Sequence, residues 1–257
     1  MLNKIAIVGS GNIAFHLSAI FTKRSITVSC IASRNKINAN EIASRINAKV
    51  CDIEALDKSV DLVIIAVSDD AIEEVINKIP KGDFIVAHTT GSVSMKVFKN
   101  KFDKYGVFYP LQSFLKSRKV DFSNIPILVE ANTEKTNQKL AELGMRISDK
   151  VEIMDSEKRK MLHLSAVIIN NFVNFLASKS YGFLEENNID SSLLQPLMLE
   201  TVNRLNNNSP HEMQTGPAKR NDEKTIKKHI DQLKSNPKLQ SLYKQLSKQI
   251  TEEYYGR

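Results

Sequence analysis

The sequence predicts an α/β fold in which a doubly wound, mainly parallel sheet is followed by an all-helical domain. The first half of the chain alternates short β-type runs with amphipathic segments, which is the pattern of βαβ units. After residue 154 strand-like runs end, and apolar residues recur at helical spacing over long stretches. We therefore expect two domains, at residues 1–154 and 155–257.

The expected strands follow one another through the first domain. They occupy residues 4–8, 27–32, 62–67, 84–87, 106–109 and 127–130, and a short strand at 151–153 closes the sheet. The run at 62–67 is continuously apolar, as a central parallel strand covered on both faces should be. Helices are expected between the strands, at residues 13–23, 39–46, 71–79 and 134–143.

Four helices are expected in the second domain. The first begins near Ser156 and is longer than most globular helices. The second follows a cap at Asp190 or Ser191 and has Pro196 near its first turn, where proline is tolerated. The four expected ranges are residues 156–186, 191–206, 223–234 and 237–253.

The chain has 257 residues, of which 42% are apolar and 25% are charged. This composition is that of a soluble globular protein. No unbroken apolar run approaches the roughly 20 residues that are needed to span a bilayer, so we expect no membrane helix. Cys30 and Cys51 lie in apolar stretches and are expected to be buried, reduced thiols, which favours the cytoplasm and no metal site.

The net charge of +7 raises the question of a nucleic-acid partner. Lysines and arginines are scattered among acidic residues, without a basic block interleaved with aromatics, so no nucleic-acid partner is expected. A solvated basic surface is one interpretation, and a pocket for an anionic cofactor or substrate is the other.

A glycine-rich turn follows the first strand directly. Gly9 would permit the tight turn, Gly11 would let the backbone approach a pyrophosphate, and Ala14 would allow close packing of helix on strand. This G-x-G-x-x-A pattern between a strand and a helix predicts a dinucleotide-binding Rossmann domain. The expected cofactor-binding residues of the turn are Gly9, Ser10, Gly11, Asn12 and Ile13.

The end of the second strand indicates which dinucleotide binds. NAD enzymes usually place Asp or Glu here, about 20 residues past the glycines, on the ribose 2′-hydroxyl. This chain instead has Ser33 and Arg34, which can donate a hydrogen bond to a 2′-phosphate and neutralise it. The alternative is that Arg34 is a surface residue. We expect NADP as the cofactor.

Two further loops follow strand ends, where ligands bind in open α/β sheets. Val67, Ser68 and Asp69 follow the central strand, with Asp69 the favoured cap of the next helix, although the cap can still line the cofactor groove. Thr89 lies in the polar cluster 88–92 after the next strand, expected near the nicotinamide.

Several segments resemble one family. They are GSGNIA, VIIAVSDDAI, AHTTGS, YPLQSF, LHLSAVIINNF and QTGPAKRND, and their order is similar to that of Rossmann proteins with a C-terminal domain of unknown function, DUF2520. The resemblance implies an NADP-dependent oxidoreductase similar in architecture to pyrroline-5-carboxylate reductase and 6-phosphogluconate dehydrogenase, with a helical domain that supports dimerisation. Tyr109 departs from the histidine usual in the family's His-Pro-Leu-Gln segment, while Gln112 is kept as a candidate substrate contact.

The long helix of the second domain carries the candidate catalytic residues. His163, Asn170 and Asn174 fall at i, i+7 and i+11, on a stripe apart from the helix's apolar face. His163 could supply a proton near neutral pH, Asn170 could donate to a developing oxyanion, and Asn174 could contact substrate. The alternative is a polar seam satisfied inside the helical domain or at a dimer interface.

A loop at residues 214–222 is the second candidate for substrate binding. Gly216 and Pro217 break the helical pattern, and Asp222 is the expected cap of the next helix. Thr215 and Lys219 could bind a substrate carboxylate or phosphate. The alternative is a rigid turn with solvated bases.

Two functions remain open on the sequence alone. The first is an NADP-dependent reductase or dehydrogenase of a small carbonyl, hydroxy-acid or imine compound, forming a homodimer through its helical domain. The second is a sensor or scaffold protein that binds NADP without catalysis. The substrate itself does not follow from fold similarity.

Overall fold

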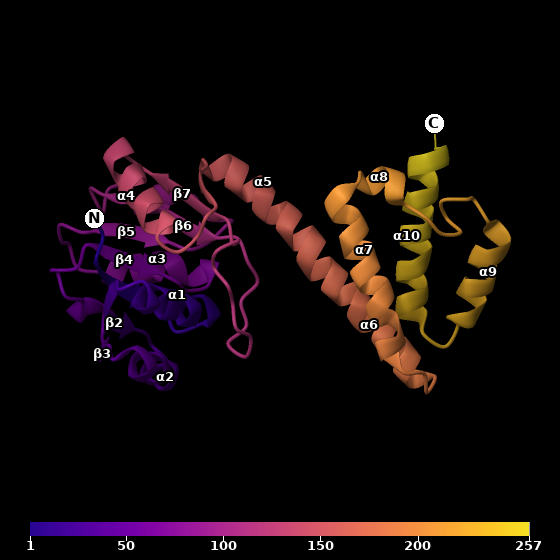
Figure 1. Ribbon diagram of the computed structural model, residues 1–257, viewed down its shortest axis with the longest axis horizontal. Helices are drawn as coiled ribbons and strands as arrows, with labels where there is room; N and C mark the ends of the chain where they lie inside the picture. Colours follow the sequence, from indigo (N-terminus) through magenta and orange to yellow (C-terminus); the bar gives the residue numbers. More distant parts are fainter. Residues whose placement is uncertain (257) are drawn as a thin grey trace. The chain divides into compact units, whose positions relative to one another are not determined.

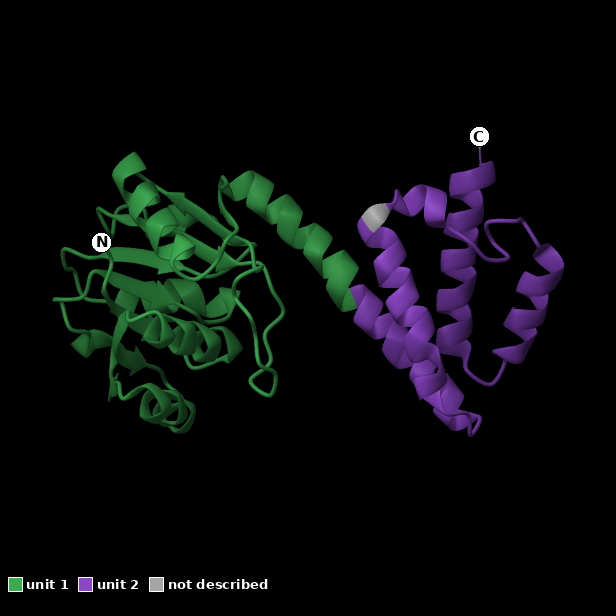
Figure 2. Cartoon of the chain, viewed as in Figure 1, with its two compact units in different colours: residues 1–171 green, residues 172–257 purple. Residues whose placement is uncertain are grey.

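The computed structural model describes residues 1–256, apart from the side chain at position 207. The chain forms two compact units, Met1–Asn171 and Phe172–Arg257, shown in two colours in Figure 2. The domain boundary expected at residues 154–155 marks the point where the sheet ends and the helices begin. The compact units divide the chain later, so the start of the long helix belongs to the same unit as the sheet. The expected boundary stays a prediction.

The first unit is built on one eight-stranded sheet, in the order β3-β2-β1-β4-β5-β6-β7-β8 (Figure 1). Its strands are β1 Lys4–Val8, β2 Thr27–Ala32, β3 Lys49–Cys51, β4 Leu62–Ile65, β5 Ile85–His88, β6 Tyr105–Pro110, β7 Ile127–Ala131 and β8 Val151–Ile153. All neighbours pair in parallel except β6 and β7. The expected mainly parallel α/β sheet is confirmed, and β3 is a strand that we did not expect.

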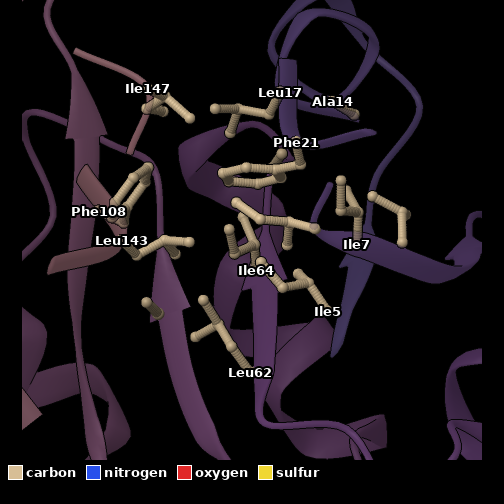
Figure 3. Close-up of a cluster of buried hydrophobic side chains, with 14 of the residues drawn as sticks. Ile5, Ile7, Ala14, Leu17, Phe21, Leu62, Ile64, Phe108, Leu143 and Ile147 are labelled. Carbon is tan, nitrogen blue, oxygen red and sulfur yellow. The ribbon is translucent and has the colours of Figure 1, made fainter. Parts of the chain in front are cut away.

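Helices cover both faces of this sheet, as a doubly wound fold requires. The helical elements are α1 Asn12–Lys23, α2 Lys36–Ile46, α3 Ile72–Lys78 and α4 Glu134–Met145, with short 3-10 turns η1 Ile53–Ala55, η2 Asp69–Ala71 and η3 Met95–Phe98. Side chains alternate along each strand, so Ile5 and Ile7 enter one core with Leu17 and Phe21 of α1 (Figure 3). Val8 enters the opposite core, which α3 and η3 cover.

A long helical segment begins where the sheet ends. It consists of α5 Ser156–Ala166, a π-helical turn η4 Val167–Phe172 and α6 Val173–Glu186. Its most apolar 18-residue window has a mean hydropathy of 1.4, so by length and composition alone it could cross a membrane. We expected no membrane helix because the sequence has no unbroken apolar run of that length, and length and average hydropathy alone do not decide the question.

The second unit contains α6 and the remaining helical elements: η5 Ser191–Leu194, α7 Gln195–Asn207, α8 Pro210–Met213, α9 Glu223–Gln232 and α10 Pro237–Tyr255. The caps agree with the sequence. Asp190 accepts a hydrogen bond from the Ser192 amide at 2.9 Å, and Asp222 accepts one from the Thr225 amide at 3.1 Å. The short helix α8 is additional to the four helices expected.

Candidate functional site

The turn after β1 has the geometry that a dinucleotide phosphate requires. Gly9 adopts φ +120°, and a Cβ there would lie 2.1 Å from the carbonyl oxygen of Ala66, so only glycine fits. Gly11 precedes α1, and a Cβ on it would meet no atom within 4 Å. The backbone of Gly11 is therefore open to a ligand at the N-terminus of a twelve-residue helix, which favours anions.

The first cavity of the site has a volume of about 270 Å³ and lies over this turn. Its lining includes Gly9, Ser10, Gly11, Ser33, Arg34, Val67 and Ser68. The hydroxyls of Ser10 and Ser33 lie 2.8 Å apart, and the Asn35 amide donates to the Ser33 oxygen at 3.2 Å. These bonds join the glycine turn to the end of β2, so residues predicted from separate segments share one cavity wall.

Arg34 extends from the rim of this cavity. Its side chain is 71% exposed, and its guanidinium lies 3.4 Å from the Glu74 carboxylate. Lys78, and then Arg34, lower the pKa of Glu74, so this carboxylate is ionised at neutral pH. An exposed pair of this kind is weak. The guanidinium is therefore free to exchange Glu74 for a phosphate.

A second cavity, of about 350 Å³, continues from the first along the ends of β1 and β4. Its lining residues are Gly11, Asn12, Ile13, Ala66, Val67, Ser68, Gln112 and Phe114. Gly11, Val67 and Ser68 also line the first cavity. Gln112 also lines a third cavity, so three adjoining hollows run along the first unit in sequence.

The third cavity has a volume of about 390 Å³. Tyr109 and Gln112 contribute to it from the end of β6, and His163 from α5. Asn170 contributes from the π-helical turn η4. A π turn holds one more residue than an α turn, and such turns occur frequently at functional sites. The structure thus brings His163 and Asn170 to one cavity, together with Tyr109.

Tyr109 and His163 form the central polar contact of the third cavity. The Tyr109 hydroxyl lies 3.0 Å from Nδ1 of His163, and the two rings meet edge to face. Burial raises the pKa of Tyr109, opposed by the positive charge of Arg159. The phenol therefore keeps its proton at neutral pH. Gly91 packs against the same imidazole, where a Cβ would lie 2.5 Å from His163 Cγ and Nδ1.

A buried ion pair fixes the base of α5 beside this contact. Arg159 is fully buried and forms an ion pair with Glu130 of β7. It also donates to the carbonyl of Val93 at 2.5 Å, while Ser156 donates to Glu130 at 2.7 Å. Because buried charges require partners, this cluster holds α5 and the loop after β5 in one arrangement. Sequence reasoning missed it, and the available signal was Glu130 inside the apolar strand 127–131, because Arg159 stands among other charged residues at 157–160.

Two residues expected at the cofactor have other contacts. Asp69 is not the helix cap, because Ser68 occupies that position and Asp69 is the first residue of η2. The Asp69 carboxylate accepts a hydrogen bond from the Ser92 hydroxyl instead. Thr89 is 2% exposed, and its hydroxyl donates to the Ile65 carbonyl at 3.4 Å. Neither residue is among those lining the three cavities described above.

The remaining substrate candidates lie in the second unit. Asn174 is in α6, beyond the π turn, which rotates it relative to the α-helical spacing assumed for the stripe. Thr215 lines a separate cavity of about 370 Å³ between α7 and the loop after α8. The Lys219 ammonium lies 3.3 Å from the centre of the Tyr254 ring. A substrate role for these three residues stays a prediction.

The described residues fit a bound NADP. Gly11 leaves open space at the phosphate position, and the Ser10–Ser33 pair and Arg34 stand where the adenosine ribose of a Rossmann ligand lies. No carboxylate lines that cavity to repel a 2′-phosphate.

Comparisons with known proteins agree with this geometry. Residues 4–91 match the family "NADP oxidoreductase coenzyme F420-dependent", and residues 125–250 match the domain of unknown function DUF2520. The chain is 32% identical to a "putative NADP oxidoreductase" of Bacteroides fragilis, covering 97% of this chain and 98% of that one with a TM-score of 0.91. No curated protein matches the chain.

More distant structures share the fold. A reductive aminase of Aspergillus terreus in complex with NADPH and ethyl-5-oxohexanoate is 14% identical, with coverages of 100% of this chain and 96% of that chain and a TM-score of 0.71. An imine reductase of Myxococcus stipitatus in complex with NADP+ is 11% identical, with coverages of 97% and 93% and a TM-score of 0.62.

These findings define a Rossmann-type oxidoreductase fold with an NADP oxidoreductase domain at its N-terminus. The chain belongs to the family that joins this domain to a C-terminal DUF2520 domain. The helix Ser156–Glu186 is part of this soluble oxidoreductase fold and not a membrane span.

Proposed function

We propose that the protein is an NADP-dependent reductase or dehydrogenase that transfers hydride between NADP(H) and a small carbonyl, hydroxy-acid or imine compound. The observation that carries the proposal is the run of three adjoining cavities in the first unit. They lead from Ser33 and Arg34, past the glycine turn, to the Tyr109–His163 contact. A dinucleotide and a small substrate need such an elongated site.

Five groups of this chain would hold the cofactor. The Gly11–Ile13 backbone at the start of α1 would bind the pyrophosphate, and Ser33 and Arg34 the 2′-phosphate. Val67 and Ser68, which line both of the first two cavities, would flank the dinucleotide between its two ends. When bound, NADPH would supply the hydride for the reaction.

Tyr109 and His163 together can supply the proton. Tyr109 and a neutral imidazole each carry one exchangeable proton, and their mutual hydrogen bond at 3.0 Å uses only one of the two. The other proton remains available to the third cavity. A carbonyl oxygen or imine nitrogen placed there would accept it as hydride arrives. The pair thus acts as a general acid in reduction and as a general base in oxidation.

Asn170 and Gln112 would orient the substrate. Both amides line the third cavity, and the Asn170 amide donates a hydrogen bond to the side chain of Asn171 at 2.9 Å. An amide can donate to a carbonyl oxygen and accept from a hydroxyl or amine. The cavity walls also contain Leu111, Val167 and Ile169, so a substrate with a short apolar chain suits this space.

We further propose that the helical domain forms a homodimer and that the protein works in the cytoplasm. Large apolar side chains are exposed on the second unit, among them Phe175 at 50%, Leu197 at 62%, Leu199 at 66% and Val202 at 52%. Exposed apolar patches of this kind commonly mark protein interfaces. The free thiols Cys30 and Cys51 support a reducing compartment.

The direct test is NADPH oxidation by the full-length protein against a panel of small ketones, keto acids and ketone–amine mixtures. Turnover with at least one class, dependent on His163 in a His163→Ala comparison, is the expected result. NADPH binding in the micromolar range without turnover on any class would favour the sensor or scaffold function instead. Failure to bind NADPH would overturn both functions.

A further inference from the structure

A separate cavity of about 570 Å³ lies outside the proposed active site. Its walls come from α1, from Arg45 of α2, from Ile147 after α4 and from the loop 116–123 between β6 and β7. It has no lining residue in common with the three cavities of the proposed active site. Phe114, which lines the second of those cavities, stacks on Phe122 and contacts His16, so an aromatic wall stands between the two regions.

The charge of this cavity is strongly one-sided. Six cationic side chains line it, and they come from three separate segments of the chain: Lys23, Arg24, Arg45, Lys116, Arg118 and Lys119. The one carboxylate in the lining is Asp121, whose pKa is lowered by hydrogen bonds from Ser123 and by Lys23 and Arg24. Its single negative charge leaves most of the positive charge uncompensated.

Ion pairs do not account for this excess. Lys116 pairs with Glu41 at 2.7 Å, but within residues 1–256 the other five cations have no carboxylate within 4.0 Å. Lys23 and Arg45 lie in the last turns of α1 and α2, where a cation stabilises the helix. Arg118 and Lys119 lie in a loop, so stabilisation of a helix end does not explain their positions. Gathering like charges around one hollow costs free energy, which a bound anion would recover.

The cavity also has an apolar wall, formed by Phe15, Ile20, Val120, Phe122 and Ile147. Arg45 lies 4.4 Å from the centre of the Phe15 ring, and the Lys116 ammonium lies 5.6 Å from it. The Phe15 ring attracts both cations, and a guanidinium can form two parallel hydrogen bonds to one phosphate group.

We propose that this cavity binds a small molecule carrying several phosphate groups, with the phosphates among the six cations and an apolar or planar part against the Phe15–Phe122 wall. The volume lies within the usual range of small-molecule sites, about 300–1,000 Å³. The concave shape, with charges converging from three segments, fits a compact polyanion better than the extended backbone of a nucleic acid. The ligand is therefore a second one, bound together with NADP.

Isothermal titration calorimetry of the full-length protein with inorganic tripolyphosphate and with ATP, without magnesium and at 50 and 300 mM KCl, tests the proposal. We expect one site per chain, tighter binding of ATP than of tripolyphosphate, and weaker binding at high salt. NADPH at saturation should leave both titrations unchanged. Displacement of either ligand by NADPH would place it in the cofactor site and overturn the proposal, as would an absence of binding at 50 mM KCl.

Two variants separate the cavity from general surface charge. Arg118→Ala combined with Lys119→Ala should weaken ATP binding at least tenfold, and Ala19→Trp should do the same by filling the cavity while keeping every charge. The matched control, Lys227→Ala with Lys228→Ala on α9, removes two equally exposed charges elsewhere and should change nothing. Equal weakening by the control, no effect of Ala19→Trp, or tighter binding of single-stranded DNA than of ATP would overturn the proposal.

Discussion

The hydroxyl of Tyr109 lies 3.0 Å from Nδ1 of His163, although 54 residues separate them in the sequence. Tyr109 is the last residue but one of the buried strand β6, and His163 belongs to α5, the helix that follows the sheet, so the fold brings them together. The His-Pro-Leu-Gln segment that residues 109–112 resemble would place a histidine at the position of Tyr109. A phenol held against an imidazole preserves an exchangeable proton at that position, which makes the departure chemically conservative.

The first prediction concerns the Tyr109 hydroxyl. Tyr109→Phe should lower kcat by about 10²-fold with an identified substrate, since general acid catalysis contributes about 10²- to 10⁴-fold. The dissociation constant of NADPH should not change. Tyr243→Phe is the matched control, because it removes the same kind of contact, a 2.8 Å hydrogen bond to His229, from the second unit. An equal effect of both variants would contradict a catalytic role.

The second prediction concerns the choice of cofactor. Arg34→Ala should weaken NADPH binding about tenfold or more, as loss of a charge-assisted hydrogen bond implies, and should leave NADH binding nearly unchanged. Fluorescence titration with both cofactors measures this. Lys78→Ala is the control, since it also deprives Glu74 of a cation but keeps Arg34. If both cofactors lost affinity equally, the proposed 2′-phosphate contact would be wrong.

The third prediction concerns the close approach of a loop to His163. Gly91→Ala would place a methyl group 2.5 Å from the imidazole, so the ring must shift and its bond to Tyr109 must break. Turnover should fall at least tenfold while NADPH affinity stays near that of the wild type. Gly182→Ala, in α6 with open space around it, should keep full activity. Wild-type turnover of Gly91→Ala would show that the Tyr109–His163 contact is not needed.

The fourth prediction concerns oligomeric state. Size-exclusion chromatography with light scattering should give about twice the mass of one 28.9 kDa chain. Leu197→Glu with Leu199→Glu on α7 should shift the protein toward monomers, because it puts charges on side chains that are 62% and 66% exposed in the single chain. Lys244→Glu, on α10, serves as a charge-changing control. A wild-type monomer at micromolar concentration would refute the dimer.

Sequence patterns predicted most of the strands of the sheet, because each strand is specified by residues within its own segment. An apolar run such as residues 62–65 and a glycine turn at Gly9 each specify their own structure. The strand Lys49–Cys51 escaped prediction because a three-residue edge strand has little pattern of its own and depends on pairing with β2. The π turn at Val167–Phe172 also escaped, since the helical periodicity around it continues.

The candidate site was predictable in parts. The glycine turn, Ser33 and Arg34 are encoded within 30 residues, and they line one cavity. The partnership of Tyr109 with His163, and the pairing of Arg159 with Glu130, arise from contacts between distant elements. A local sequence pattern does not show which distant residue a buried polar or charged side chain contacts. These two contacts could therefore be found only from the three-dimensional structure.

The last prediction is a loss of stability in mild acid, caused by His88. Burial, and then the charge of Arg159, lower the pKa of His88 to about 3. Between that value and the ordinary pKa of about 6.5, the unfolded chain binds a proton that the folded chain does not. Folding stability is therefore complete above pH 6.5 and decreases as the pH falls below it, by about 2 kcal/mol at pH 5 from this group alone.

Urea denaturation at pH 7.5 and pH 5 measures this loss. His88→Gln should reduce the difference in unfolding free energy between the two pH values, because glutamine does not titrate and can still accept the hydrogen bond that the Thr90 amide gives to Nδ1 of His88. His211→Gln, at an exposed position, should leave the difference unchanged. An unaltered pH dependence in His88→Gln would mean that His88 is not the group responsible for the loss of stability.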